Sequence, residues 1–282
     1  MRKRISFISV LTMFLAIGFV IIFSRPVKAA ANGVILKSNR TYAAYDVTGD
    51  GMKDKIRIRA ANPTDDEAYA SLTVSVNGKT AYRLKNTRFY NVIANIYTLK
   101  NGQPFLYLYA PAENGDGPVC ALLKYTNGKF RKILDFTEIM AGYGNHRIGE
   151  VTNLNGNKIV ITESIVSYSL GINAINFTYK YVNGKFVPTS RYGSYKEIYS
   201  ADGSSRYFTV NSDLPAYTRP DATAVNTTLK TGSLTKIIKC ALISGKMYIQ
   251  LECDGEIYWI KALENPPIAD NERQFMEVRY AG

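Results

Sequence analysis

Oxygen-bearing side chains recur at alternate positions in the segment 46–54, Asp-Val-Thr-Gly-Asp-Gly-Met-Lys-Asp. A hard cation such as Ca²⁺ takes about six to eight oxygen ligands, and a tight glycine turn lets side chains from such a segment converge on one point. Gly51, at the sixth position, provides that turn. We therefore predict a calcium site whose ligands are the side chains of Asp46, Thr48, Asp50 and Asp54 and the main-chain carbonyl of Met52.

A strand rather than a helix is expected after this loop, because residues 55–59 alternate between basic and apolar side chains. The Glu that closes the loop of an EF-hand at its twelfth position is also missing. The alternative interpretation is a polar turn that joins two strands without a metal. Three carboxylates within a few residues repel one another unless a cation lies between them, which favours the calcium site.

The pattern Asp-x-Thr-Gly-Asp-Gly-x-x-Asp ahead of a strand resembles the calcium loops of FG-GAP and VCBS-type repeats, which form the blades of integrin-like β-propellers. The close match covers about nine residues of the chain. The resemblance implies ligand roles for Asp46, Asp50, Asp54 and the Met52 carbonyl. Thr48 stands where many members of that group carry Asp or Asn.

The composition of the 282-residue chain favours β-structure, with 21 Tyr, 12 Phe and 21 Gly, and its length suggests two domains. The formal charge is +12, but five basic residues belong to the leader, so 35 − 5 = 30 basic residues face 23 acidic ones, a balance of +7. Such an excess attracts anionic polymers such as cell-wall teichoic acids, although scattered basic groups also make ordinary solvated strand faces. We do not expect a nucleic-acid partner for an exported chain.

Residues 1–31 have the pattern of an export signal, with a basic start, an apolar run over residues 5–23 and small residues at 29–31. The apolar run is 19 residues long and could also remain as an uncleaved membrane anchor, which would be the only membrane contact. Both alternatives place the rest of the chain outside the cytoplasm, so we expect a secreted or cell-surface protein.

An internal repeat appears in the Asn-Gly pairs, which are strong hairpin signals between alternating strands. The series at 77, 127 and 183 has spacings of 50 and 56, and the series at 101 and 155 interleaves with it. The segment 124–130, Lys-Tyr-Thr-Asn-Gly-Lys-Phe, returns almost unchanged at 180–186. A period near 50 suits four short strands and predicts three propeller-type blades in a domain spanning 32–200, with units at 42–84, 90–136 and 149–195. They form either an open array or a propeller completed by other strands.

The pattern changes after residue 205, where five or six short strands follow within residues 207–265. The order of Leu-x-x-Tyr-x-x-Pro at 214–220, Leu-Lys-x-Gly at 229–232 and Asp-Gly-x-x-x-Trp-Ile at 254–260 resembles bacterial Src-homology-3-like domains. The resemblance implies a small β-barrel that docks on cell-wall peptide or glycan. Tyr258 replaces the glycine that usually precedes the Trp. In the tail, 266–282, residues 275–280 alternate as a final strand would.

Catalytic patterns are scarce in the chain. His146 is the only histidine, the sequence has no nucleophile-elbow, metalloprotease or phosphate-loop motif, and Asp135 and Glu163 look like ordinary turn and strand acids.

Cys240 and Cys253 would need a bulge to form a disulfide, and Cys120 is expected to be a buried free thiol. The tyrosines could build a sugar-stacking surface, although strand tyrosines more often pack on their neighbours. The candidate binding residues are Tyr107, Tyr109, Tyr217, Tyr258 and Trp259.

These features together predict an all-β protein, with a blade-like antiparallel repeat domain followed by a small Src-homology-3-like barrel. Our leading hypothesis is a non-catalytic, calcium-binding module for adhesion or for binding cell-wall polymer, surface glycan or peptide. The alternative is an accessory cell-wall hydrolase or carbohydrate-active protein that uses surface carboxylates.

Overall fold

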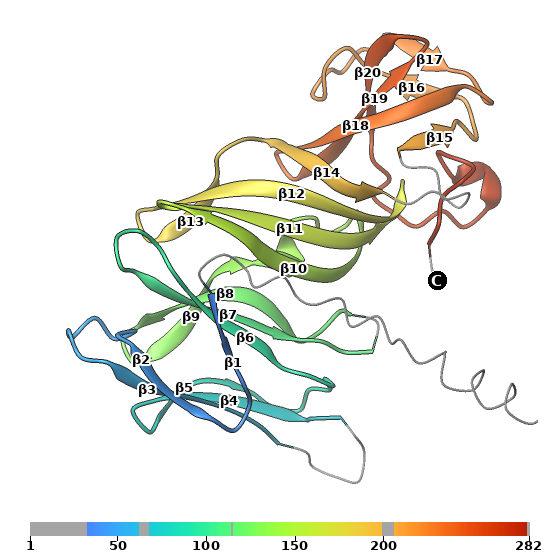
Figure 1. Cartoon of the computed structure of the whole chain (residues 1–282). Helices are drawn as coiled ribbons and strands as arrows, with labels where there is room; N and C mark the ends of the chain where they lie inside the picture. Colours follow the sequence, from blue (N-terminus) through green and yellow to red (C-terminus); the bar gives the residue numbers. More distant parts are fainter. Residues whose placement is uncertain (1–32, 62–67, 114, 199–205, 281–282) are drawn as a thin grey trace, which may run out of the picture. The chain divides into compact units, whose positions relative to one another are not determined.

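The computed structural model describes residues 33–61, 68–113, 115–198 and 206–280 (Figure 1). In these residues the chain is all-β, as predicted: antiparallel sheets are joined by turns and accompanied by two short 3₁₀ helices, Phe136–Glu138 and Asp270–Glu272. None of the described sheets closes into a barrel. No helix within the described ranges is long and apolar enough to cross a membrane, and the candidate leader lies outside them.

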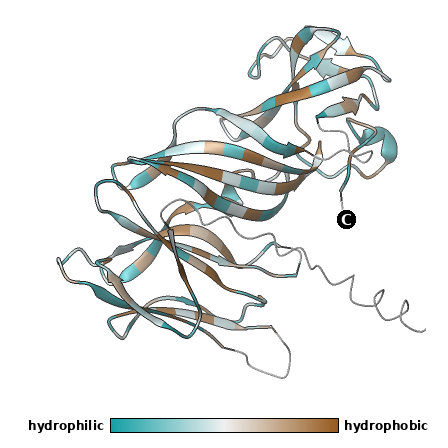
Figure 2. Ribbon diagram, in the orientation of Figure 1, coloured by the Kyte–Doolittle hydropathy of each residue, from teal (hydrophilic) through white to brown (hydrophobic). Residues whose placement is uncertain are grey.

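The first sheet contains β2 (Thr41–Tyr45), β3 (Asp54–Ala61), β4 (Ser71–Val76) and β5 (Lys79–Leu84), in that spatial order. It matches the first predicted unit, 42–84. Hydrophobic and hydrophilic residues alternate along its strands, because successive side chains point to opposite faces (Figure 2). Ile56 and Ile58 are fully buried, whereas Lys55, Arg57 and Arg59 are exposed.

The second sheet has the order β1-β6-β7-β8-β9. Four of its strands, β6 (Ile93–Thr98), β7 (Pro104–Ala110), β8 (Val119–Thr126) and β9 (Lys129–Asp135), form the second predicted unit, and β1 (Gly33–Leu36) is added beside β6. Every residue of β7 is buried, so this sheet is covered on both faces.

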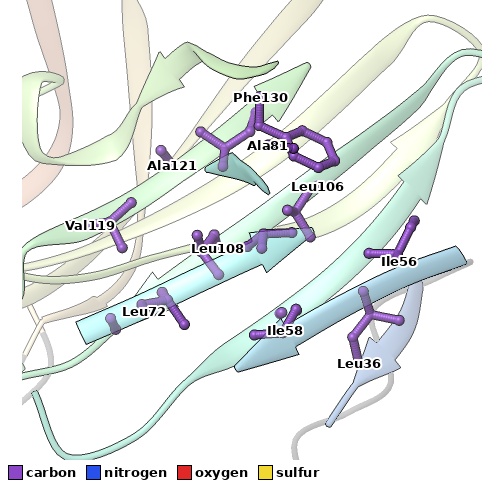
Figure 3. Packing of buried hydrophobic residues seen from close by; sticks show 14 of the residues in the cluster. Leu36, Ile56, Ile58, Leu72, Ala81, Leu106, Leu108, Val119, Ala121 and Phe130 are labelled. Atoms are coloured by element: carbon purple, nitrogen blue, oxygen red, sulfur yellow. The ribbon is translucent and has the colours of Figure 1, made fainter. Parts of the chain in front are cut away.

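One face of the second sheet packs on the first sheet (Figure 3). The core between them contains Ile56, Ile58 and Leu72 from the first sheet and Leu106 and Leu108 from the second. Burying a side chain of this size stabilises the fold by about 1.5–3 kcal/mol. Truncating one of these side chains to Ala would therefore cost about 2–5 kcal/mol once the cavity is included.

The other face of the second sheet packs on the third unit. The hydroxyls of Tyr97 and Tyr107 donate to the main-chain carbonyls of Val151 (3.5 Å) and Gly149 (2.6 Å), and the Phe105 ring lies 5.0 Å from the Tyr181 ring. The three units therefore stack face to face, with the second unit in the middle.

The third unit consists of β10 (Gly144–Asn155), β11 (Lys158–Ser167), β12 (Gly171–Val182) and β13 (Lys185–Pro188). β14 (Tyr192–Ile198) pairs with β12 and also with β18 (Leu234–Ile243). The sheet therefore continues across the predicted domain boundary at 200–207. It contains nine strands, ending in β19 (Lys246–Cys253) and β20 (Glu256–Lys261), with β15 (Tyr207–Thr209) paired to β18.

The Asn-Gly pairs form hairpin turns at equivalent places in the three units. At Asn77-Gly78, Asn127-Gly128 and Asn183-Gly184 both residues have positive φ, between 49° and 84°, as a type I′ turn requires. They join β4 to β5, β8 to β9 and β12 to β13. In each unit the turn therefore lies between the third and the fourth of four consecutive antiparallel strands, about 50 residues from its counterpart in the next unit.

The six short strands predicted between residues 207 and 265 are present as β15–β20, including the hairpin of β16 (Leu214–Ala216) and β17 (Thr227–Leu229). The final strand predicted at 275–280 is wrong. Phe275 makes only an isolated bridge to Val210, because the Glu277 carboxylate accepts hydrogen bonds from the Thr209 amide and hydroxyl where a ladder would continue. The tail still lies against β15, because the Met276 amide donates to the Thr209 carbonyl (2.9 Å).

Candidate functional site

The predicted calcium loop connects β2 to β3, so a strand follows it, as the sequence indicates. Asp54 is the first residue of β3 and is 1% exposed. Its carboxylate accepts hydrogen bonds from the amides of Val47 (2.7 Å) and Thr48 (2.9 Å) and from Asn77 Nδ2 (2.6 Å) in the β4–β5 turn. Asp54 therefore ties both ends of the loop to the neighbouring hairpin.

Asp46 organises the other half of the loop. Its Oδ1 accepts hydrogen bonds from the amides of Gly49 (2.6 Å) and Asp50 (3.2 Å), and its Oδ2 accepts one from the amide of Gly51 (2.8 Å). Gly49 and Gly51 have φ of 81° and 86°, a backbone conformation that glycine adopts without strain. Desolvation acts to raise the pKa of Asp46, but these amides outweigh it and hold that pKa below its ordinary value.

The Thr48 hydroxyl oxygen lies between the two carboxylates, 3.3 Å from Asp46 Oδ1 and 3.3 Å from Asp54 Oδ1. Neighbouring oxygens around Ca²⁺, with bonds of roughly 2.3–2.6 Å at right angles, are roughly 3.3–3.7 Å apart. Thr48 Oγ1 therefore lies at the spacing of an adjacent calcium ligand from each carboxylate oxygen, and the same distances are weak hydrogen bonds donated by the hydroxyl. Hard carboxylate and hydroxyl oxygens suit that ion.

The remaining predicted ligands are not gathered with these three. The Asp50 carboxylate accepts a hydrogen bond from the Met52 amide (2.8 Å), and both side chains are exposed. In the described part of the chain no group of three or more His, Cys, Asp or Glu side chains could hold a metal ion. The loop thus fits calcium in part, and its internal hydrogen bonds also suit the metal-free polar turn.

A hollow of about 500 Å³ lies beside the loop. It is lined by three polar segments: Asp46–Gly49 of the loop, Asn101–Pro104 of the β6–β7 turn and Lys124–Asn127 at the β8–β9 turn. Sequence reasoning found each of these turns but not the space that they enclose together. The signal in the sequence was that the two Asn-Gly series interleave. Interleaving places the turns of successive units at corresponding positions.

Two candidate binding tyrosines are inside the protein. Tyr107 and Tyr109 are 2% and 4% exposed, and the Tyr109 hydroxyl donates to the carbonyls of Gly115 and Arg147. Burial raises the pKa of Tyr107 well above its ordinary value, which keeps the phenol protonated. Their ring faces are therefore covered by neighbouring sheets and present no surface to a sugar.

The other candidates lie near β20. Tyr217 and Trp259 are buried and exchange main-chain hydrogen bonds of 2.8 Å with each other, whereas the adjacent Tyr258 is half-buried. The Trp259 ring lies 5.9 Å from that of Tyr192, and Lys239 Nζ sits 4.5 Å from the Tyr192 ring centre. The Lys239 ammonium group makes cation–π contacts with both rings, and Tyr192 remains 36% exposed while Trp259 is buried.

Sequence reasoning missed a buried acid and histidine pair. Glu163 is 0% exposed, and His146 Nε2 lies 3.2 Å from its Oε2 without the alignment of a good hydrogen bond. Burial, and secondarily Asp135, raises the pKa of Glu163 well above its ordinary value, and burial lowers the pKa of His146. Burial therefore disfavours the charged form of each group. The register pairs Glu163 with Gly149, where a Cβ would lie 2.4 Å from Glu163 Oε1.

The three cysteines are free and buried, which confirms the expectation for Cys120. Cys240 pairs with Ile249 and Cys253 with Thr235, so the disulfide alternative is not formed. Burial raises the pKa of Cys120 and Cys240 to about 12, a value at which the thiols stay protonated. No family model, curated protein or solved structure matches the chain.

Proposed function

We infer that this protein is a secreted or cell-envelope binding module that holds cell-wall glycan in the hollow beside the loop 46–54, with calcium ordering that loop. The observation that carries the proposal is the hollow itself. Its lining brings carboxylate, amide and hydroxyl groups from three separate turns to one place. Such a set of hydrogen-bonding groups suits the many hydroxyls of a sugar.

Calcium would supply the positive charge that holds Asp46 and Asp54 on either side of Thr48. In this chain Asp54 anchors the site to Asn77, while the glycine-rich half of the loop wraps around Asp46. The same loop residues line the hollow, so ordering the loop would also preorganise one wall for its ligand. An affinity for calcium near roughly 0.1–1 mM suits an extracellular module.

The stacked units support a classification as propeller-type blades. Each unit is a four-stranded antiparallel meander, and the second is buried between the other two. We propose that the three form an open array of blades. The order of β15–β20 agrees with that of a bacterial Src-homology-3-like module, here joined to the third unit through β14 and β18.

The test measures binding of the full chain to isolated cell walls, either with about 1 mM calcium or with chelator. This calcium concentration is about the dissociation constant expected for such sites. A Gln103→Ala/Thr126→Ala double variant removes two side chains that line the hollow, and Gln250→Ala/Thr228→Ala on the C-terminal strands is the matched control. We expect binding to fall at least about tenfold, or about 1.4 kcal/mol, in the first variant and to be unchanged in the control.

Two outcomes would contradict this function. Equal binding by both variants would exclude the hollow as the glycan site. Release of soluble fragments from the walls, abolished by removing a carboxylate, would instead favour the hydrolase alternative.

A further inference from the structure

The outer face of the first sheet carries rows of basic and hydroxyl side chains. The register places Arg59 of β3 opposite Thr73 of β4, and Thr73 opposite Arg83 of β5. The next row runs from Arg57 through Ser75 to Thr80. These rows face away from the core, because the intervening residues Ile56, Ile58, Leu72 and Val74 are fully buried.

The face continues over the edge strand β5 into a groove of about 250 Å³ between β5 and β9. Thr80 and Arg83 line one side of the groove, and Lys129 and Arg131 line the other. Lys129 Nζ donates to the Thr80 carbonyl (3.2 Å), and Arg83 Nη2 donates to the Thr80 hydroxyl (3.4 Å). All three cationic side chains are exposed, so their remaining donors are accessible to a ligand.

Among the described residues, the exposed charges of this surface are all positive, whereas the acids Asp65, Asp66 and Glu67 between β3 and β4 lie outside the described ranges. Strands β3, β4 and β5 contain five basic residues and one acid, Asp54, which is buried on the opposite face and bonded within the loop. The groove adds Lys129 and Arg131, and no acidic residue lines it. The next basic residue of β9, Lys132, is already paired with Asp135 at 2.6 Å.

Protection of sheet edges explains only part of this pattern. Exposed Lys and Arg side chains on edge strands prevent edge-to-edge aggregation, which accounts for those on β5 and β9. β3, however, pairs with β2 on one side and β4 on the other. Its Lys55, Arg57 and Arg59 guard no edge, so a second reason is needed for three cations there.

We propose that the outer face of β3–β5 and the adjoining groove bind a phosphodiester-linked anionic polymer that lacks bases. Arginine guanidinium groups match phosphate oxygens in bidentate geometry, and the Ser and Thr hydroxyls between them add further donors. The two aromatic residues of the groove are Phe130, which is 5% exposed, and Tyr82, which is half-buried. Neither offers an open ring for base stacking, which excludes the usual single-strand nucleic-acid mode. This surface shares no lining residue with the glycan hollow and goes beyond the proposed function.

The test measures binding of the full chain to poly(glycerol phosphate) in about 150 mM salt, a physiological ionic strength. The variant Arg59→Glu/Arg83→Glu/Arg131→Glu reverses three charges of the surface. The matched control, Lys158→Glu/Lys185→Glu/Lys246→Glu, changes the net charge equally at exposed hairpin residues elsewhere. Charged side chains of either sign protect a sheet edge, so neither variant should gain edge-to-edge aggregation.

We expect the surface variant to bind at least about thirtyfold more weakly and the control less than about threefold more weakly. The slope of log K against log salt concentration should also become about two units shallower in the surface variant, because each lost phosphate contact removes roughly 0.7 of a unit. If the charge reversal prevents folding, the neutral Arg59→Gln/Arg83→Gln/Arg131→Gln variant should still lose at least about tenfold. Equal losses in variant and control would overturn the proposal, as would equally tight binding of polyglutamate or single-stranded DNA by the unaltered chain. Neither of these two results would test glycan binding in the hollow, because that proposal is tested with variants at other residues.

Discussion

Two acids are buried in different units of this protein, and their surroundings are opposite in character. Asp54, in the first unit, accepts hydrogen bonds from two main-chain amides and from Asn77, which stabilise a carboxylate. Glu163, in the third unit, faces Gly149 and the Phe136 ring, and burial raises its pKa well above the ordinary value. The two buried acids therefore differ in the donors around them: three donors reach the Asp54 carboxylate, whereas neither Glu163 oxygen accepts a hydrogen bond from the described residues.

The same comparison explains why only the first unit has a loop. The amides of the glycine-rich turn are used by Asp46 and Asp54, so the chain leaves the ladder between β2 and β3. The equivalent segment of the third unit, 150–157, has lost two of the carboxylates, and most of it runs as the end of strand β10. Without these acceptors its amides remain in the sheet.

The largest predicted effect is that of Asp54→Ala. It removes the acceptor of the Val47 and Thr48 amides and of Asn77, so we expect a loss of about 3 kcal/mol in the free energy of unfolding by urea. Asp50→Ala, at an exposed loop position, should cost less than about 0.5 kcal/mol in calcium-free buffer. Similar costs for the two variants would show that Asp54 is not the anchor of the loop.

The next effect tests the other acid. In Gly149→Ala the new Cβ would lie 2.3 Å from Phe136 Cδ1 and 2.4 Å from Glu163 Oε1, which should cost about 2 kcal/mol. Combining it with Glu163→Ala should recover part of this loss, because one clash is removed. Strict additivity in thermal or urea unfolding would contradict a direct contact between the two positions.

Calcium should stabilise the first unit by a smaller amount. With 1 mM ion and a dissociation constant of roughly 0.1 mM, the gain is about 1.4 kcal/mol, seen as a higher melting temperature. The Asp50 carboxylate, which here accepts from the Met52 amide, would have to turn to the ion when calcium binds. Asp50→Ala should then lower the melting temperature in calcium to near that of the calcium-free protein, by loss of one ligand. An unchanged melting temperature on adding chelator would reject the metal and leave the polar turn.

The smallest effect is the pH dependence from Glu163. Its folded pKa is raised, so the unfolded chain releases this proton first and stability falls as pH rises above about 4.5. Glu163→Gln should remove that slope, so the stability of the variant relative to the unaltered chain should be more favourable at about pH 8 than at about pH 4.5. The pKa of His146 is lowered, so its contribution is present above about 6.5 and lost as pH falls below that value. An unchanged slope in the variant would place the titration on another group.

The sequence alone determined the strands, the turns and their repetition. Alternation of apolar and polar residues defines strand faces, and Asn-Gly requires the positive φ of type I′ turns, as at Asn77, Asn127 and Asn183. These are local properties, so a single segment is enough to recognise them. The same holds for the loop between β2 and β3 and for the six short strands near the carboxyl end.

Tertiary structure decided which of these local pieces meet. Asn77 reaches Asp54 across 23 residues, Gly149 makes room for Glu163, and β14 joins the third unit to β18. Sequence periodicity carries no information about such partners, because pairing between distant segments depends on complementary volumes and on donors that only the fold brings together. For the same reason Glu163 looked ordinary in the sequence, while burial by the packed sheets around it raises its pKa well above the ordinary value.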